Sequence, residues 1–424
     1  MENRTDKLCS YLNSARSVFH AVAGLVKELE NAGFVRQLEQ DAWELVPGGK
    51  YYLTRGGSSV MAFRIPEGTP NGFAMSASHA DRPTFKVKEN PVLTGKYTRL
   101  SVERYGGMLM APWLDRPLSV AGRAVVETEN GVESRLVDFD RDLLLIPNVA
   151  IHMNRQANDG YKWNPAVDLL PLMGGTKEQW EAALEEAAGG KVLGHDLYLY
   201  VRQKAAVWGL ENDFISAPAL DDLMCAWCCA QGFLEAENGS NVQVLCVFDS
   251  EEVGSSSLQG AGSDLLQSLL ERICAACDWD LKQMLANSFM VSADNAHAIH
   301  PNHPEFADPA NAPVLNGGVV LKFNANQRYT TDGISSAIFR KICGKADVPV
   351  QTYCNRADLP GGSTLGNISL CHVSVPSVDI GLPQLAMHSC YETSGVRDAE
   401  SLIGAMRCYY ESDMKAAADG CYTL

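Results

Sequence analysis

The chain has 424 residues, 46% of them hydrophobic, and a formal net charge of −16 at pH 7. This length allows two or three domains with a sizeable core. The negative charge argues against a nucleic-acid-binding protein, which needs a basic surface to neutralise phosphates, and against binding to an anionic membrane surface.

The sequence also lacks the features of a membrane or exported protein. No apolar run approaches the roughly 20 residues that cross a bilayer, and residues 1–20 show no apolar segment of signal-peptide type. The 13 cysteines have no regular spacing. With no export signal and no spacing typical of a disulfide framework, we expect a cytoplasmic protein with reduced thiols.

The first 90 residues predict a helix followed by strands. Apolar residues recur at helical spacing over residues 8–34, which predicts one amphipathic helix with Gly33 as its stop signal. Residues 51–66 surround Gly56 and Gly57 and are typical of a β-hairpin. Residues 72–81 form an apolar strand with polar residues at its end.

The pattern changes between about Pro91 and Gly209. Residues 117–139 alternate like paired strands around an Asn130-Gly131 turn. Residues 175–189 form a short polar segment of helical character that resembles an insertion, and residues 196–209 are again strand-like. This middle block is predicted to be essentially all-β.

The remainder of the chain alternates between helices and strands. Helices are predicted over residues 221–236, 262–277 and 334–346, and strands or extended segments over residues 241–248, 288–297 and 372–381. Residues 409–420 are expected to be the end of a solvated helix. This alternation predicts a parallel-rich sheet with helices on both faces, and functional groups of such sheets collect at the carboxyl ends of the strands.

Acidic and histidine side chains recur at these strand ends or beside a helix start. They are His79, Asp81, Asp221, Glu251, Glu252, Asp294 and His388. Histidines mixed with carboxylates suit zinc, manganese or cobalt, and a pair of metal ions needs a bridging carboxylate. Taken singly, each residue has an ordinary structural explanation, such as a helix cap for Asp221 or Asp222. Their recurrence favours a metal site, in which one of the two adjacent glutamates binds metal and the other acts as general base.

Eight segments, which together span most of the chain, resemble one family of peptidases. They are SHADRPTFKVK, IHMNR, APALDDL, VFDSEEVGS, SADNAHAIHPN, NANQRYTTDG, STLG and DIGLPQLAMHS. In this combination and order they are similar to the aspartyl aminopeptidases and the vacuolar aminopeptidase I group, which are co-catalytic zinc metallopeptidases.

The resemblance implies a role for each site residue. His79 and His388 would bind different metal ions, Asp221 would bridge the ions, and Glu252 and Asp294 would complete the ligand sets. Glu251 would be the general base, and Asp81 would support the His79 ring. The substrate-binding residues would be His297, Lys322 and His152, the last reaching a neighbouring subunit's active site.

The resemblance also implies the architecture and the reaction. We expect an α/β zinc-peptidase domain of three layers with a mixed sheet, formed by residues 1–91 and 210–424 and interrupted by an all-β dimerisation domain at 92–209. Dimers would assemble into a tetrahedral dodecamer. Each subunit would hold two divalent metal ions, zinc first with cobalt or manganese as alternatives, and would remove N-terminal residues from peptides.

Some points stay open at the level of sequence. Asp222 stands where the family commonly has Asn, which leaves the metal and the substrate preference unsettled. Lys322 could favour acidic first residues, but the family also includes members that prefer neutral ones. Two other functions are compatible with the sequence: a related metallohydrolase acting on other amides, such as N-acyl amino acids, and an inactive cargo or scaffold homologue.

Overall fold

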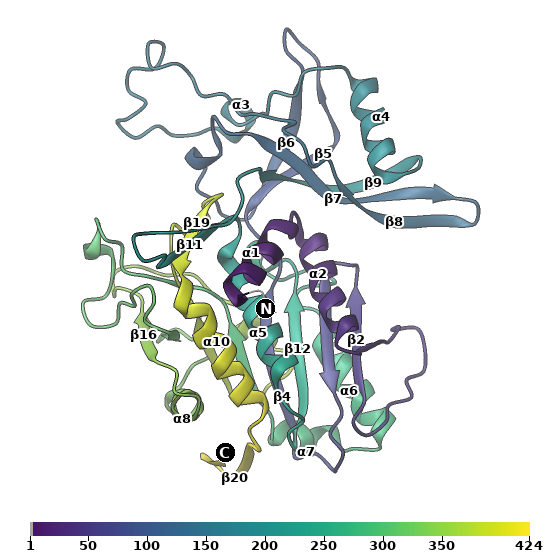
Figure 1. The fold of residues 1–424 in the computed structure, drawn as a ribbon, viewed down its shortest axis with the longest axis vertical. Helices are drawn as coiled ribbons and strands as arrows, with labels where there is room; N and C mark the ends of the chain where they lie inside the picture. Colours follow the sequence, from purple (N-terminus) through teal and green to yellow (C-terminus); the bar gives the residue numbers. More distant parts are fainter. Residues whose placement is uncertain (1–2) are drawn as a thin grey trace.

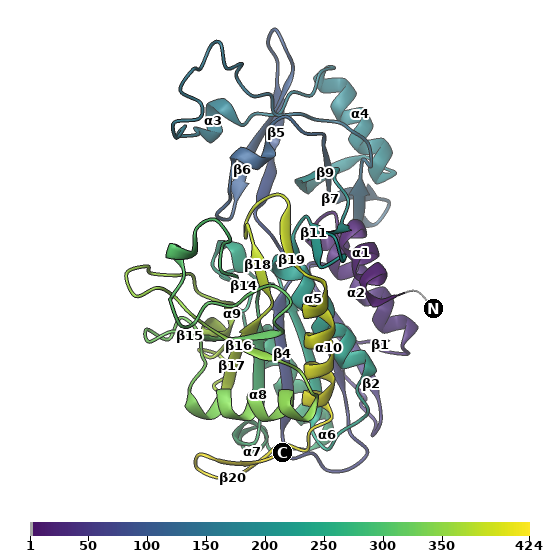
Figure 2. The same ribbon diagram turned by 60° about the vertical axis from the view of Figure 1, so that its left-hand side comes forward.

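The structure is a computed structural model that describes residues 3–424. It has two stacked parts (Figure 1), which we call the β part and the α/β part. The β part is the region of residues 84–201, from the first to the last strand of its own sheet, and the α/β part is the rest. The chain enters and leaves the β part at neighbouring points above the α/β part (Figure 2).

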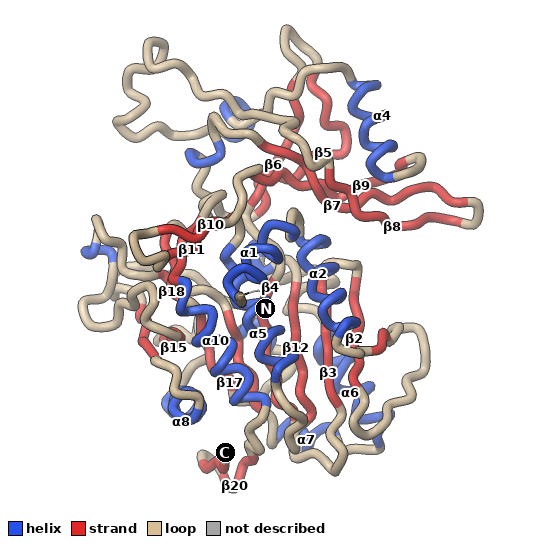
Figure 3. Tube along the Cα trace, viewed as in Figure 1, coloured by secondary structure: helices blue, strands red, loops and turns tan. Residues whose placement is uncertain are grey.

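A nine-stranded mixed sheet forms the centre of the α/β part (Figure 3). The central strands β12, β4, β13 and β17 run parallel to one another, whereas β3 pairs antiparallel with β12 and β15 pairs antiparallel with β17. In sheet order the strands are β1 (Val35–Arg36), β2 (Lys50–Arg55), β3 (Ser59–Arg64), β12 (Val242–Phe248), β4 (Phe73–His79), β13 (Phe289–Ala293), β17 (Ser377–Gly381), β15 (Val319–Phe323) and β16 (Val350–Cys354). The central strands are buried on both faces, which explains their continuous apolar sequences.

Helices cover both faces of this sheet and give three layers. One core packs the sheet against α1 (Arg4–Ser14), α2 (Val18–Asn31), α5 (Leu220–Glu235), α8 (Gly333–Lys345) and α10 (Val396–Tyr410). The core on the opposite face includes α6 (Leu265–Cys277), α7 (Leu281–Ala286) and α9 (Leu365–Ser369). The predicted fold class, a three-layer α/β domain with a mixed sheet, is confirmed.

The prediction of one helix over residues 8–34 is wrong, because the structure has two helices, α1 and α2, with a break at Ala15–Ser17. Arg82, which lies far along the chain, donates hydrogen bonds to the carbonyl oxygens of Ala15 and Arg16. These carbonyls are thereby satisfied outside a helix, and the chain turns. Apolar residues keep their helical spacing across this turn, which is why the sequence predicts a single helix.

The prediction of a solvated helix end at residues 409–420 is also wrong. Tyr409 and Tyr410 are fully buried, and the Tyr409 hydroxyl lies within hydrogen-bond distance of the carbonyl oxygens of Phe289, at 2.7 Å, and Met75, at 3.0 Å. The helix ends at Tyr410. The residues after it form a hairpin of β20 (Lys415–Ala418) and β21 (Cys421–Thr423).

The β part has an antiparallel sheet in the order β6-β5-β9-β7-β8, with α4 packed against it. The turn between β7 and β8 lies one residue before the predicted Asn130-Gly131 pair, at Glu129 and Asn130, because Gly131 already pairs with Thr128 as the first residue of β8. Its elements are β5 (Thr84–Leu93), β6 (Arg99–Tyr105), the short helix Ala111–Trp113, β7 (Leu118–Thr128), β8 (Gly131–Asp138), α3 (Pro165–Asp168), α4 (Lys177–Ala188) and β9 (Val192–Val201).

A second, smaller sheet lies beside the carboxyl ends of the central strands (Figure 2). Its strands, in order, are β10 (Ala206–Trp208), β11 (Phe214–Ala217), β19 (Glu392–Gly395), β18 (Pro383–Leu385) and β14 (Ala296–His297). Two short helices complete the described elements, Glu251–Val253 and Pro304–Phe306.

Within residues 3–424, no helix is both long enough and apolar enough to cross a membrane.

Candidate metal centre and active site

Three adjacent parallel strands carry predicted site residues to one edge of the large sheet. His79 is the last residue of β4, Glu251 and Glu252 follow β12, and Asp294 follows β13. Because β12, β4 and β13 are neighbours and parallel, their carboxyl ends meet at the same place. The expectation that groups at successive strand ends come together is therefore met for these four residues.

Asp221 and His388 complete the cluster from other elements. Asp221 lies at the start of α5, where its backbone is not helical, and His388 lies in the loop between β18 and β19. Asp221 Oδ1 lies 3.7 Å from His79 Nε2, and Asp221 Oδ2 lies 3.4 Å from His388 Nε2. The two oxygens of one carboxylate thus face two different histidines.

Two potential metal-binding groups share Asp221. One is His79, Asp221 and Asp294, and the other is Asp221, Glu252 and His388. In each group the potential ligand atoms lie within 4.8 Å of one another. Glu252 Oε2 lies 3.4 Å from His388 Nε2. Glu252 belongs to the second group only. This is the arrangement that two metal ions bridged by one carboxylate require.

Asp81 fixes both His79 and the turn that carries the glutamates. The His79 Nδ1 atom lies 3.1 Å from the Asp81 carbonyl oxygen and 3.3 Å from Asp81 Oδ1. The same carboxylate accepts hydrogen bonds from the backbone N–H groups of Glu251 and Glu252, at 3.1 Å each, and from the Tyr105 hydroxyl at 2.8 Å. Asp81 therefore joins the ends of β4 and β12, and Tyr105 brings in β6 of the β part.

Burial and the mutual repulsion of carboxylates dominate the electrostatics of the cluster. Burial, followed by the charges of Asp294, Asp81 and Asp221, raises the pKa of Glu251 to about 8 against the opposing effect of His79. Burial likewise raises the pKa of Asp294 to about 6, although Lys322 opposes the shift. Neighbouring cations would reverse this repulsion and favour the ionised carboxylates.

Unpartnered oxygen atoms in the cluster provide a test of whether metal ions fit. Asp221 Oδ1 and Glu252 Oε1 are buried, and neither has a hydrogen-bond partner among the described residues. A buried carboxylate oxygen without a partner is unfavourable unless another group compensates it. Imidazole nitrogens and carboxylate oxygens are the ligands that zinc accepts. The residues present therefore fit divalent metal ions.

Comparison with known proteins identifies the family of this chain. The family model described as aminopeptidase I zinc metalloprotease (M18) matches residues 11–410. The chain belongs to this family. It is 41% identical to a probable M18 family aminopeptidase 2 of Clostridium novyi (strain NT), over 93% of this chain and 95% of that protein. The chain is thus an M18 metallo-aminopeptidase, a hydrolase of the predicted class.

Solved structures of this family share the fold. A chain in the cryo-EM structure of the Ape4 and Nbr1 complex superposes with a TM-score of 0.92 and 34% identity, covering 96% of this chain and 85% of that chain. The S. cerevisiae mApe1 dodecamer gives a TM-score of 0.86 at 24% identity, with 97% of both chains covered. The second likeness concerns the fold alone.

The predicted substrate residues of this M18 aminopeptidase occupy different environments. Lys322, on β15, is only 2% exposed, and its Nζ donates to the carbonyl oxygens of Asp294 and Asn295 at 2.9 and 3.2 Å. His297, on β14, packs edge-on against Tyr353 and lines a cavity of about 480 Å³. His152 is exposed on the loop between β8 and α3, in the β part, and belongs to neither potential metal group.

Sequence analysis missed Glu392, whose carboxylate accepts hydrogen bonds from the backbone N–H groups of Asp221 and His388. A glutamate four residues after His388 was the available signal, but nothing in the pattern separated it from a solvated turn residue. The unusual Asp222 also has a defined contact. The Asp222 Oδ2 atom accepts a hydrogen bond from the backbone N–H of His79 at 3.2 Å. The buried Oδ1 atom of Asp222 has no partner among the described residues.

Proposed function

We propose that the two groups joined by Asp221 each bind one divalent metal ion, zinc first, and that the pair hydrolyses the N-terminal peptide bond of peptides. The observation that carries this proposal is the orientation of Asp221, whose two oxygens face His79 and His388 respectively. His79 and Asp294 would complete one site, and Glu252 and His388 the other. Bound metal ions would supply Lewis-acid polarisation of the scissile carbonyl and would lower the pKa of water.

Glu251 is the proposed general base. Its carboxylate is close enough to His79, Asp221 and Asp294 for their charges to alter its pKa, yet Glu251 belongs to neither ligand group. In the proposed reaction Glu251 takes a proton from the attacking water and returns it to the nitrogen of the leaving amine. Asp81 holds the Glu251 backbone in place through the N–H bond to its Oδ1 atom.

Lys322 and His297 are the two residues of the α/β part that are predicted to bind the substrate. The Lys322 ammonium already contacts two carbonyl oxygens, and it lies 3.5 Å from Asp294 Oδ2 and 4.9 Å from the centre of the Tyr329 ring. These contacts support a role for Lys322 in fixing Asp294. His297, beside its cavity, stays the predicted contact for the substrate.

We also propose that subunits assemble through the β part into a dimer-based dodecamer in the cytoplasm. The S. cerevisiae mApe1 structure is described as a dodecamer. The β part of this chain exposes Val149, Ile151 and Met153 around His152, which supports contact with another subunit. His152 would then reach a neighbouring active site. The boundaries at 92 and 209 stay predictions.

Initial rates on dipeptides test this function. The panel has Asp, Glu, Leu or Lys as the free first residue, with matched N-acetylated forms, and it is measured with added zinc, cobalt or manganese and again after chelation. We expect hydrolysis of free peptides only, lost on chelation and restored by metal. Hydrolysis of the acetylated forms would indicate a different amidohydrolase, and full metal content without hydrolysis would indicate an inactive homologue.

A further inference from the structure

Glu392 is a buried carboxylate at the point where two ligand-bearing segments meet. It is the first residue of β19 and is 1% exposed. Its Oε2 atom accepts the Asp221 N–H at 3.0 Å, and its Oε1 atom accepts the His388 N–H at 2.6 Å. Each oxygen of Glu392 thus holds the backbone of one proposed metal ligand, and neither oxygen is spent on a solvent contact or an ordinary surface ion pair.

Both of these backbone segments have irregular conformations. Asp221 has non-helical dihedral angles although it lies within the first turn of α5. His388 has a φ of 67°, in the left-handed region that residues other than glycine rarely adopt. Such conformations persist only where surrounding contacts hold them.

The small sheet places β19, which begins at Glu392, between β11 and β18. The antiparallel pairing of β11 with β19 sets Glu392 opposite Ala217, four residues before Asp221. His388 lies four residues before Glu392 on the other side. The ladder therefore fixes Glu392 against Ala217, and the two hydrogen bonds of Glu392 connect this ladder to Asp221 and His388.

We infer that Glu392 is a positioning residue that sets the distance between Asp221 and His388 before metal binds. The inference rests on the proposed metal site. The contact that Glu392 would set is the 3.4 Å separation of Asp221 Oδ2 and His388 Nε2. Glu392 offers one acceptor oxygen to each N–H group, whereas a glutamine in its place offers only one acceptor oxygen in total. Loss of this acceptor would let the two ligands move apart, and the metal shared between them would bind less tightly.

Asp398 offers a matched control in the same fold. It is also fully buried, and its carboxylate also accepts two backbone N–H groups, from Asn316 at 2.7 Å and from Gly318 at 2.8 Å. Neither of these segments carries a proposed metal ligand. The variants Glu392→Gln and Asp398→Asn therefore each remove one of two carboxyl oxygens that accept backbone N–H groups, but only the first acts on the metal centre.

The experiment measures metal binding rather than activity. The wild type and both variants are stripped with a chelator and titrated with Co²⁺, which is followed by its visible absorption, and affinity is measured by competition with a chelator of known strength. Melting temperatures are recorded with and without metal. Partners that orient metal ligands typically contribute about 10–100-fold to affinity. We expect a loss of that size in Glu392→Gln and a change of less than about threefold in Asp398→Asn, with both variants less stable without metal.

Equal losses of affinity in the two variants, or wild-type affinity in Glu392→Gln, would overturn the inference. Glu392→Asp covers the case in which Glu392→Gln does not fold. It keeps both carboxyl oxygens, but it is one methylene shorter and cannot span both N–H groups, so its affinity for Co²⁺ is expected to fall below that of the wild type. Unchanged affinity would again contradict the positioning role. If the wild type itself takes up no Co²⁺, the proposed metal site fails and not merely the role of Glu392.

Discussion

The α/β part and the β part use charged and apolar residues in opposite ways. In the α/β part the carboxylates of Asp81, Asp221 and Asp294 are buried at the end of fully buried central strands. In the β part the charges lie in half-exposed pairs, such as Lys86 with Asp196, while Val132 and Leu136 on the edge strand β8 are exposed. Buried charge needs a counter-charge, and exposed apolar surface needs a cover. The contrast therefore supports the proposed metal site in the first part and the proposed subunit contact in the second.

Among the variants that test this contrast, Asp221→Asn should have the largest effect on metal content and activity. The substitution keeps the size of the side chain but removes the charge that both metal groups share, so we expect both ions to be lost. Activity should fall by more than the roughly 10²–10⁴-fold that removal of a general base alone costs. Metal analysis after gel filtration and initial rates on free dipeptides measure the two effects.

Asp196→Asn in the β part is the control for this variant. Asp196 accepts from both Lys86 and Arg123 but lies outside the cluster. Metal content and rates should stay at the wild-type level. An Asp221→Asn protein that retains two ions per subunit would show that Asp221 is not the bridge.

Glu251→Gln should separate metal binding from the chemistry. The amide cannot take up a proton, so turnover should fall by about 10²–10⁴-fold, while both ligand groups remain complete. Metal content per subunit and kcat are the measurements. Turnover near that of the wild type would remove Glu251 from the mechanism, and loss of metal would reassign it as a ligand.

Lys322→Met should weaken the α/β part and reduce all activities alike. It leaves Asp294 without its buried partner, and removal of one member of a buried pair typically destabilises by about 3–5 kcal/mol. Because Lys322 contacts Asp294, kcat/KM should fall by a similar factor for peptides that begin with Asp, Glu or Leu. A selective loss for acidic peptides would instead make Lys322 the selector of the first residue.

Lys86→Met is the corresponding change in the β part. Lys86 pairs with Asp196 at 2.8 Å, and both side chains are about one-third exposed. Such pairs contribute about 0–1 kcal/mol. The large difference in stability expected between Lys322→Met and Lys86→Met measures the contrast between the two parts directly.

The α/β part was largely predictable because apolar strands ending in polar groups carry a strong signal. The sequence puts His79, Glu251, Glu252 and Asp294 at the ends of apolar strands, and in the structure these strand ends lie at one edge of the sheet. The break between α1 and α2 was not predictable, because Arg82 creates it from a distant strand end. The role of Glu392 was not predictable for the same reason, because its hydrogen-bond partners, the backbone N–H groups of Asp221 and His388, come together only in the folded chain.

The β part was predictable only in its local pattern. Alternating residues and the Asn130-Gly131 turn indicated paired strands. The same alternation does not say which exposed apolar side chains another subunit covers, because that depends on surface geometry between copies. The role of His152 therefore rests on family resemblance, whereas the cluster at the sheet edge also rests on the geometry of this chain.

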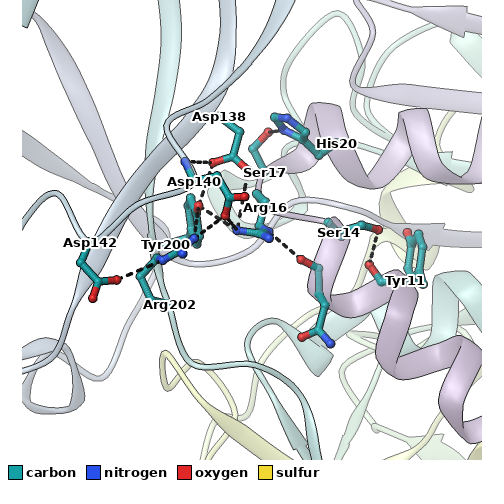
Figure 4. A network of polar contacts seen from close by, with 12 residues as sticks. Tyr11, Ser14, Arg16, Ser17, His20, Asp138, Asp140, Asp142, Tyr200 and Arg202 are labelled. Carbon is teal, nitrogen blue, oxygen red and sulfur yellow. Dashed lines mark hydrogen bonds and ion pairs between the residues drawn. The ribbon is translucent and has the colours of Figure 1, made fainter. Parts of the chain in front are cut away.

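The two parts meet at a polar network that should contribute stability but no chemistry (Figure 4). The Tyr200 hydroxyl donates to Asp138 Oδ1 at 2.7 Å and accepts from Arg16 and Arg202. Tyr200→Phe removes these bonds, and we expect a loss of about 1 kcal/mol in stability. Thermal unfolding and kcat/KM measure the outcome. Tyr97→Phe, at an exposed site, is the control, and a fall in kcat/KM without a fall in stability would show that the junction acts on the site.

His20, at the same junction, should give the smallest effect, which depends on pH. Its Nδ1 atom lies 2.9 Å from the Ser17 hydroxyl (Figure 4), and burial lowers the pKa of His20 to about 4, with Asp138 opposing the shift and Arg82 and Arg16 adding to it. An unfolded chain binds the proton nearer to the usual pKa of about 6.5. The unfolded state is therefore favoured increasingly as pH falls from about 6.5 towards 4. His20→Asn should flatten the dependence of melting temperature on pH in this window, whereas His300→Asn, at an exposed position, should leave it unchanged. Parallel curves of melting temperature against pH for the wild type and His20→Asn would show that the junction tolerates a charged His20. They would also show that the burial of charged groups, which distinguishes the metal centre, does not extend to the contact between the two parts.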